Sequence, residues 1–319
     1  MSTTTASPLP WYRQIDWLGM VPFFAMHLGC LAVFWVGWSW TALAVAFVVY
    51  AVRGMALTGF YHRYFAHKAF QTSRWFQFLW AFIGCAAAQR GPIWWAAHHR
   101  DHHSHSDEPE DEHSPIQHTF LWSHMGWFMT EPNAQLRVKR VPDLMKFPEL
   151  VFINKYDGIA VLTHGLLMYG LGWALQTWAP QLGVTAWQMF VWGFLISTVF
   201  LYHVTYCINS LAHVLGRRRF ITTDHSRNNW LLALFAFGEG WHNNHHYYPA
   251  SARNGFYWWE VDVTYYMIWT FEKLGLVWNV KPVPEKVLEL GRTNPAHGIP
   301  LGTKAEADQP TLQTPVAQS

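Results

Sequence analysis

Histidine residues gathered in three short groups are the part of this sequence best suited to chemistry. The chain contains 19 His, and the groups are His62–His67, His98–His103 and His242–His246. A neutral imidazole is a good ligand for transition metals, so several imidazoles aimed at one place form a metal site. A structural zinc site uses four ligands. At least eight candidate ligands are available here, which indicates two metal ions.

Spacing within the groups tests whether the rings can converge. Residues at i, i+3 and i+4 share one helix face, so each of two triplets could aim three rings at one point. These triplets are His99, His102 and His103, and then His242, His245 and His246. His62 and His67 are five apart, which on an α-helix separates their directions by about 140°. We expect the two rings to reach one site only if the pair lies near a helix end or flanks the site from two sides.

A further polar pair lies at the end of an apolar stretch, where an unpaired polar group is costly. Asn209 and His213 are four residues apart and would share one helix face. They join the set of candidate site residues.

Composition places the chain in a membrane. It is 51% hydrophobic, contains 21 Trp and is only 13% charged, about half the charged share of a soluble domain. The stretches 17–52 and 158–216 contain no Asp, Glu, Lys or Arg. Each is long enough for a hairpin of two spans of roughly 20 residues. We predict spans near 17–36, 40–58, 160–178 and 187–208.

The distribution of Lys and Arg sets the expected orientation. Neither hairpin turn carries one, whereas 59–157 carries ten and the chain after Gly216 another ten. Both termini and all three histidine groups should therefore face the cytoplasm. The apolar run 75–88 is too short to cross and is expected at the membrane interface or as a re-entrant segment; a fifth span would put the first two groups on opposite sides.

Other parts of the chain carry weaker expectations. The net charge of +2 carries no nucleic-acid signature. The acidic segment 107–112 predicts a solvated loop, and Arg217–Arg219 predict an orientation signal near headgroups or a phosphate contact. We expect residues 1–12 and 291–319 to be disordered, with one domain over 13–290. No cleavable signal peptide is evident at the polar start.

The histidine groups resemble the three histidine boxes of membrane fatty acid desaturases. The resemblance runs from about residue 20 to 275 and also includes Ser123-His124-Met125-Gly126-Trp127 and Asn209-Ser210-Leu211-Ala212-His213. It is greatest to the bacterial form of the acyl-CoA delta-9, or stearoyl-CoA type, desaturases. An all-α integral membrane fold with four transmembrane helices and a helical cytoplasmic cap is what this resemblance implies, in a bacterial inner membrane.

The resemblance also implies a site and a reaction. The site is a di-iron centre, with Asn209 acting through a bound water and nine His as ligands: His62, His67, His99, His102, His103, His213, His242, His245 and His246. The reaction is O2-dependent removal of two hydrogens from a long saturated acyl chain. A separate electron donor, of ferredoxin or cytochrome type with its reductase, is expected.

Two residues are candidates for the wall of an acyl tunnel. Tyr50 lies about twelve residues before His62 and could set tunnel depth or simply pack, and Trp95 could line a bend or pack. Acyl-CoA and acyl-lipid substrates cannot be separated by any compact motif. The rival functions are another histidine-box hydroxylase or monooxygenase and a metal transporter. A transporter would require acidic or His residues aligned through the spans.

Overall fold

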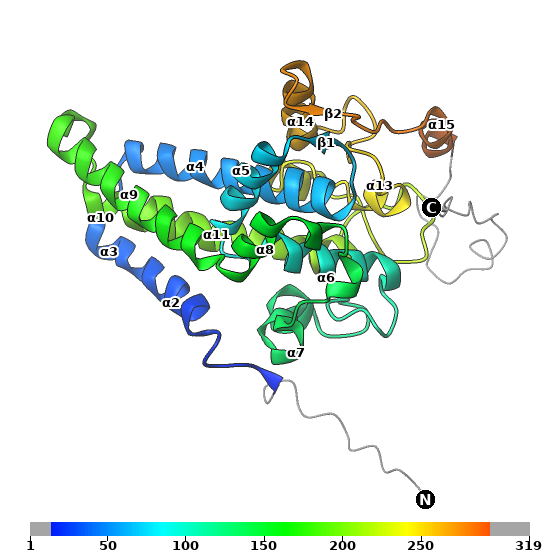
Figure 1. Ribbon diagram of the computed structural model, residues 1–319, viewed down its shortest axis with the longest axis horizontal. Coiled ribbons are helices and arrows are strands. Elements are labelled where there is room, and N and C mark those ends of the chain that lie inside the picture. The colour runs from blue at the N-terminus through cyan, green and yellow to red at the C-terminus, as the bar shows by residue number, and fades with distance from the viewer. Residues whose placement is uncertain (1–13, 294–319) are drawn as a thin grey trace, which may run out of the picture.

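Helices make up most of the protein, and the long ones extend together toward one end of the molecule. The computed structural model describes residues 14–293. Three helices are long and apolar enough to cross a membrane: Trp40–Ala66, Gly158–Trp178 and Ala186–His213. In Figure 1 they lie side by side and point away from the shorter helices, which gather at the other end. The membrane-like composition thus belongs mostly to one end of the fold.

The long helices are built from consecutive segments of different winding. The first joins α4 (Trp40–Met55) to the π-helix η2 (Ala56–Ala66), and the second is α9 (Gly158–Trp178). The third joins α10 (Ala186–Phe190), η8 (Val191–Ile196), α11 (Ser197–Asn209) and η9 (Leu211–His213). Two of the helices run beyond the predicted spans 40–58 and 187–208. Their extensions carry His62 and His213 out of the apolar stretch.

The predicted span 17–36 is shorter in the structure. Its helical part is Val21–Val36, made of α2 (Val21–Gly29), η1 (Cys30–Ala32) and α3 (Val33–Val36). At 1.5 Å per residue this is about 24 Å, less than the roughly 30 Å of a hydrocarbon core. Gly37, with φ +65°, ends the helix, and Ser39 caps the next one by accepting the N–H of Ala42. A hairpin therefore forms where the sequence places its turn.

The shorter helices pack around the end of the bundle that carries the histidine groups. They are α5 (Arg74–Cys85), η3 (Trp122–Gly126), η4 (Trp127–Met129), α6 (Pro92–His105), α7 (Glu131–Ala134), η5 (Val138–Arg140), η6 (Leu144–Lys146), α8 (Pro148–Lys155), α12 (Trp230–Phe235), α13 (His242–Tyr247), α14 (Val263–Lys273) and α15 (Glu285–Thr293). The turn between α9 and α10 contains η7 (Pro180–Leu182), and strands β1 (Gln71–Thr72) and β2 (Val277–Trp278) form one antiparallel pair. At 12 residues α5 is too short to span a bilayer.

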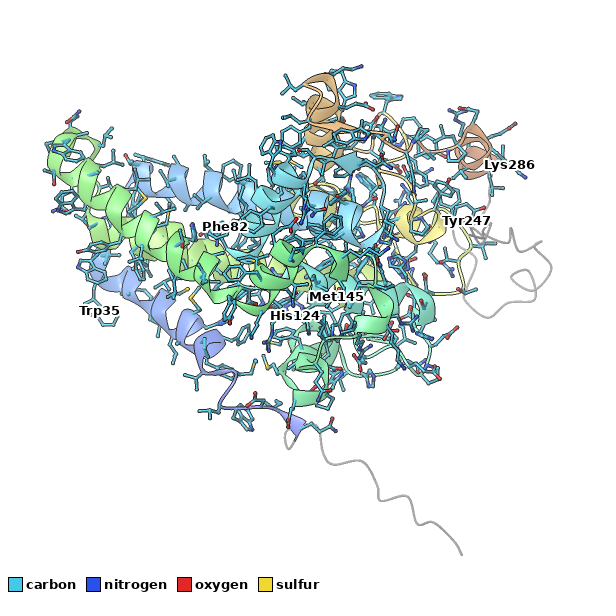
Figure 2. The ribbon with its side chains drawn as sticks, viewed as in Figure 1. Trp35, Phe82, His124, Met145, Tyr247 and Lys286 are labelled. Carbon is cyan, nitrogen blue, oxygen red and sulfur yellow. The ribbon has the colours of Figure 1, made fainter. Side chains whose placement is uncertain are left out.

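The main buried core surrounds η2. Phe60, Tyr61 and Phe65 are fully buried, and α5 and α6 pack against this segment. Outer faces of the long helices are apolar and exposed instead, as at Leu162 and Leu166 on α9. Figure 2 shows Trp35 projecting from α3, where it is 82% exposed. Apolar side chains facing outward suit lipid rather than water.

The expected disordered ends fall almost entirely outside the described residues. Residues 1–12 and 294–319 lie there, whereas 291–293 form the last residues of α15.

Candidate metal centre

The π-helical winding of η2 brings His62 and His67 together. A π-helix pairs residue i with i+5, and the N–H of His67 bonds the carbonyl of His62 at 3.1 Å. The two ring centroids are 4.8 Å apart. Residues five apart thus lie one turn above one another, which α-helical geometry did not predict. The expectation of a helix end was also met, because His67 is the C-cap residue.

The two histidine triplets do not each aim at one point, contrary to the prediction. On α6, His99 and His103 turn toward one group, whereas His102 turns toward another. On α13, His245 joins the first group, and His242 and His246 join the second. Residues at i and i+4 share a face, but the whole triplet spans a wider arc. Each triplet therefore contributes to two neighbouring sites.

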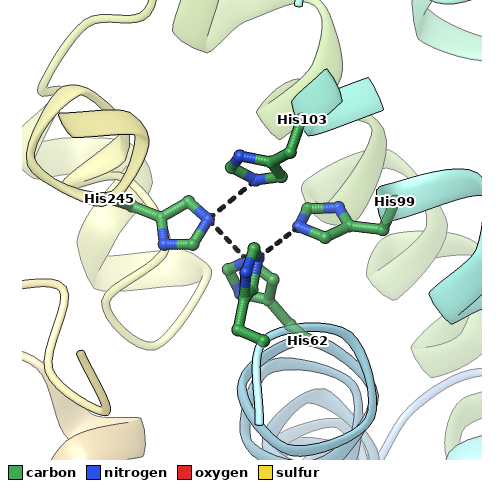
Figure 3. A group of neighbouring side chains, drawn as sticks. His62, His99, His103 and His245 are labelled. Atoms are coloured by element: carbon green, nitrogen blue, oxygen red, sulfur yellow. Dashed lines mark hydrogen bonds between the residues drawn. The ribbon is translucent and has the colours of Figure 1, made fainter. Parts of the chain in front are cut away.

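Five of the nine predicted ligands form what we call the first histidine cluster: His62, His67, His99, His103 and His245. Figure 3 shows four of them converging from η2, α6 and α13. Nε2 of His245 lies 2.9 Å from Nε2 of His62 and 3.0 Å from that of His103. Nε2 atoms of His67 and His99 are 2.8 Å apart.

The other four predicted ligands form the second histidine cluster: His102, His213, His242 and His246. His213 and His242 approach through their Nε2 atoms at 3.1 Å. Each cluster has all its ligand atoms within 4.8 Å of one another. The structure therefore gathers all nine predicted His into two adjacent clusters.

The chemistry of these nitrogens fits metal ions. The Nε2 atom of His246 is buried without a hydrogen-bond partner among the described residues, which is costly unless something else satisfies it. Burial, reinforced by neighbouring imidazoles, lowers the pKa of His99, His103 and His245 well below the ordinary value. Neutral imidazoles with inward lone pairs are the form that binds a cation.

Carboxylates hold several of these rings by the opposite nitrogen. Nδ1 lies 2.6 Å from Glu239 in His62, 2.8 Å from Asp107 in His213, 2.9 Å from Asp111 in His102 and 2.7 Å from Asp224 in His246. A ring that donates from Nδ1 keeps its Nε2 lone pair free for a metal. Sequence reasoning did not assign these carboxylates a role.

Part of the acidic segment 107–112 is buried, so the prediction of a solvated loop was wrong there. Asp107 and Asp111 are 8% and 2% exposed, while Glu108 and Glu110 are exposed. Burial raises the pKa of Asp111, but His102 and His113 outweigh it and hold that pKa far below its ordinary value.

Histidines outside the clusters have hydrogen-bonding roles. His98 is buried, and its Nε2 lies 3.3 Å from the carbonyl of Gln135. His164 bonds the carbonyl of Gly193 at 3.0 Å, and Nε2 atoms of His27 and His203 are 3.2 Å apart. His124 bonds Ser210 rather than a ring of either cluster. These contacts agree with a structural role for the His residues within the spans.

An apolar cavity of about 650 Å³ leads to the first cluster. Its wall includes Phe23 and Met26 of α2, Val161 and Leu162 of α9, and Tyr202 of α11. This volume lies within the range of small-molecule sites.

The inner end of the cavity meets a second, narrow space of about 50 Å³. Four residues line both spaces: Trp95, His99, Thr205 and Asn209. The narrow space also touches His62 and His242, one from each cluster. A chain threaded through both spaces would pass beside both histidine clusters.

The structure brings Trp95 and Asn209 to this passage but not Tyr50. The indole of Trp95 stacks on His99, with centroids 4.9 Å apart. Tyr50 is buried, donates a hydrogen bond to the carbonyl of Phe235 and packs on Phe237 at 5.2 Å between centroids. Phe237 itself lines the narrow space, so Tyr50 lies one side chain behind that wall.

Together these features define a helical protein of membrane type that positions two histidine clusters able to hold metal ions beside an apolar cavity. A sequence model of the family described as fatty acid desaturase matches residues 38–280. The chain belongs to the fatty acid desaturase family.

Relatives in this family cover most of both chains. The sn-1 stearoyl-lipid 9-desaturase of Anabaena variabilis is 37% identical over 86% of this chain and 96% of its own. Delta-9 acyl-lipid desaturase 1 of Arabidopsis thaliana is 37% identical over 85% and 86%. An acyl-CoA 5-desaturase of Anemone leveillei is 34% identical over 86% and 82%. Named substrates among these relatives thus include both acyl carriers.

Proposed function

We propose that this protein is an O2-dependent desaturase of long-chain saturated acyl groups, acting at the delta-9 position in the synthesis of unsaturated fatty acids. The observation that carries the proposal is the apolar cavity, which reaches His99 and Asn209 at the histidine clusters. A metal transporter would need a polar path through the spans. Here the passage to the metal centre is apolar, which suits an acyl chain.

The proposed metal ions are two irons. The nine clustered His would hold them, with Asn209 acting through a water. When bound, iron supplies oxidation by O2 of an acyl C–H bond that has no activating group nearby. The overall change converts CH2–CH2, O2, two electrons and two protons into CH=CH and two waters.

The chain's own contribution is to position the substrate and exclude water. Trp95 and Thr205 lie where the wide cavity meets the narrow space, so a threaded chain is confined there. Holding one C–C bond in a fixed place lowers the entropy cost of reaction. The depth of the narrow space and the bend at Trp95 would select which bond reacts.

Acyl-CoA is the carrier that the resemblance to the stearoyl-CoA type desaturases favours. Three cationic residues that could contact the phosphates of CoA, Arg100, Arg137 and Arg140, are however engaged within the protein. Arg100 pairs with Asp143 at 2.7 Å, and Arg137 and Arg140 both pair with Asp101. A charged cofactor would have to compete with these pairs.

A membrane lipid is the second candidate carrier. Pro22 and Ala25 of α2 and Leu162 of α9 line the wide cavity and are also exposed. This edge lies on the apolar part of the fold, where an acyl chain could pass sideways from the bilayer. Two of the relatives described above are named for acyl-lipids, which favours the same carrier.

The proposed setting is a bacterial inner membrane with the metal centre and both termini in the cytoplasm. Helix Val21–Val36 would form the fourth span beside the three longer helices, and the shorter helices would form a cytoplasmic cap. One catalytic domain would cover 13–290. Electrons would come from a separate ferredoxin-type or cytochrome donor with its reductase.

The test is expression in a host that lacks the activity, followed by location of double bonds by mass spectrometry in CoA and phospholipid pools. New delta-9 unsaturated chains support the proposal. The pool in which these chains appear first, CoA or phospholipid, identifies the carrier. A hydroxylated product without a double bond would instead identify the rival monooxygenase. His242→Ala should abolish the product, because it removes a proposed ligand.

A further inference from the structure

The two histidine clusters differ sharply in the carboxylates that hold their rings. In the second cluster, three of the four rings bond a carboxylate through Nδ1, namely Asp107, Asp111 and Asp224. In the first cluster, Glu239 is the one carboxylate bonded to a ring among residues 14–293. A carboxylate on the outer nitrogen raises the basicity of the ring and strengthens its bond to a metal.

The net charge of the groups around each cluster also favours metal binding at the second cluster. Glu239 also pairs with Arg63 at 2.9 Å, so a cation already offsets its charge. Arg63 in turn pairs with Asp262 at 3.0 Å. Glu239, Arg63 and Asp262 together carry one net negative charge, whereas the three carboxylates bonded to the second cluster carry three.

Within residues 14–293, the carboxylates at the second cluster have no such cation. Asp107, Asp111 and Asp224 are 8%, 2% and 4% exposed, and within the described residues none contacts a Lys or Arg side chain. Their partners are imidazoles, hydroxyls and backbone amides: His213, His225 and Ser114 for Asp107, His102 and His113 for Asp111, and His246, Thr222 and Ser226 for Asp224. Buried carboxylates without compensating charge are costly. A divalent cation at the adjacent Nε2 atoms would supply that charge.

We propose that the two clusters are unequal metal sites, and that the second cluster binds its metal ion more tightly and is loaded first. Asp107, Asp111 and Asp224 are the positioning residues responsible for the difference. The number of imidazoles would predict the opposite order, because the first cluster has five and the second has four. The order in which the two clusters bind metal therefore shows whether carboxylate charge or the number of imidazoles determines the affinity.

The inference rests on the proposed function only in taking the clusters as metal sites. It can be measured without acyl substrate or O2. Protein in detergent is stripped with a chelator and titrated with Co2+, whose visible absorption reports ligand environment, while bound metal is counted by elemental analysis. We expect two separate steps of one equivalent each.

Matched variants assign the steps to the clusters. Asp224→Asn should weaken the first, tight step by about 10- to 100-fold, the usual effect of losing such a partner. Glu239→Gln should leave the tight step in place and weaken the second. Asp111→Asn serves as a second variant if Asp224→Asn does not fold, which circular dichroism and elution volume would reveal.

Two results would overturn the inference. One is a single step of two equivalents with equal affinity in the unaltered protein. The other is loss of the tight step in Glu239→Gln with its retention in Asp224→Asn. Two unequal sites in a protein that forms no double bond would reject the proposed function alone, whereas an active desaturase with equal sites would reject only this inference.

Discussion

The Nδ1 atom of His124 lies 2.9 Å from the hydroxyl oxygen of Ser210, and Ser123 donates a hydrogen bond to the carbonyl of Asn209 at 3.2 Å. These contacts join two sequence motifs that are 86 residues apart. They hold the backbone at Asn209, whose side chain lines both cavities. His124 also contacts His203 at 3.0 Å, which links the same point to α11.

Replacing His124 with Phe should destabilise this junction. The change removes one hydrogen bond from the Ser210 hydroxyl, which keeps its bond to the carbonyl of Tyr206, and leaves Nδ1 of His203 without its partner, which costs about 1–3 kcal/mol. We expect a lower denaturation temperature in detergent and a lower turnover rate, because Asn209 loses its support. His118→Phe is the control, since His118 is exposed in the same segment. Equal effects of the two variants would contradict the assignment.

Tyr50 should influence chain length through Phe237. Tyr50→Ala removes a ring from behind the wall of the narrow space and lets Phe237 shift, so acyl chains longer than the normal substrate should be accepted. Loss of a buried aromatic ring should also lower stability by about 3–5 kcal/mol. Tyr50→Phe retains the ring and should keep the original preference. Competition between acyl chains of different length measures the effect, and an unchanged product profile in Tyr50→Ala would refute it.

Trp95 should control which bond reacts. Trp95→Leu removes the indole that stacks on His99, which widens the passage where the two spaces meet. We expect the double bond to spread over neighbouring positions and turnover to fall about tenfold, equivalent to about 1.4 kcal/mol in the barrier. Trp75→Leu, on the exposed face of α5, is the control. A single, unaltered double-bond position in Trp95→Leu would show that the indole only packs.

Acid should destabilise the fold through His98. Burial, with a smaller contribution from Arg137, lowers the pKa of this imidazole to about 3. Between pH about 6.5 and 3 the unfolded chain binds a proton that the folded chain does not, so the free energy of unfolding falls as pH falls. The slope is about 1.4 kcal/mol per pH unit for one group.

The measurement is the denaturation temperature of the protein from pH 7 to 5, compared with His98→Gln. The variant removes this proton and should show a shallower loss of stability on acidification. Parallel curves for the two proteins would mean that His98 is protonated in the folded state.

The sequence alone determined the membrane class, the positions of the long helices and the nine clustered His. Local signals were sufficient because span length, absence of charge and histidine spacing are properties of contiguous segments. Two of the helices continue beyond the predicted spans into polar residues, which the tertiary packing around η2 and η9 supports. At the start of the first predicted span the helix is shorter than the span, because the apolar residues 17–20 form a turn and the helix begins at Val21.

Only the tertiary structure decided how the ligands divide and what holds them. Winding η2 as a π-helix places His67 above His62, and the placement of α6 and α13 divides each triplet between the two clusters. Asp107 reaches His213 from 106 residues away, and Glu239 reaches His62 from the turn between α12 and α13. Such contacts depend on the relative placement of distant segments, for which local periodicity carries no information. The three histidine groups were thus readable from spacing and the full set of nine from the family resemblance, whereas the carboxylates that distinguish the two clusters became visible only in the folded chain.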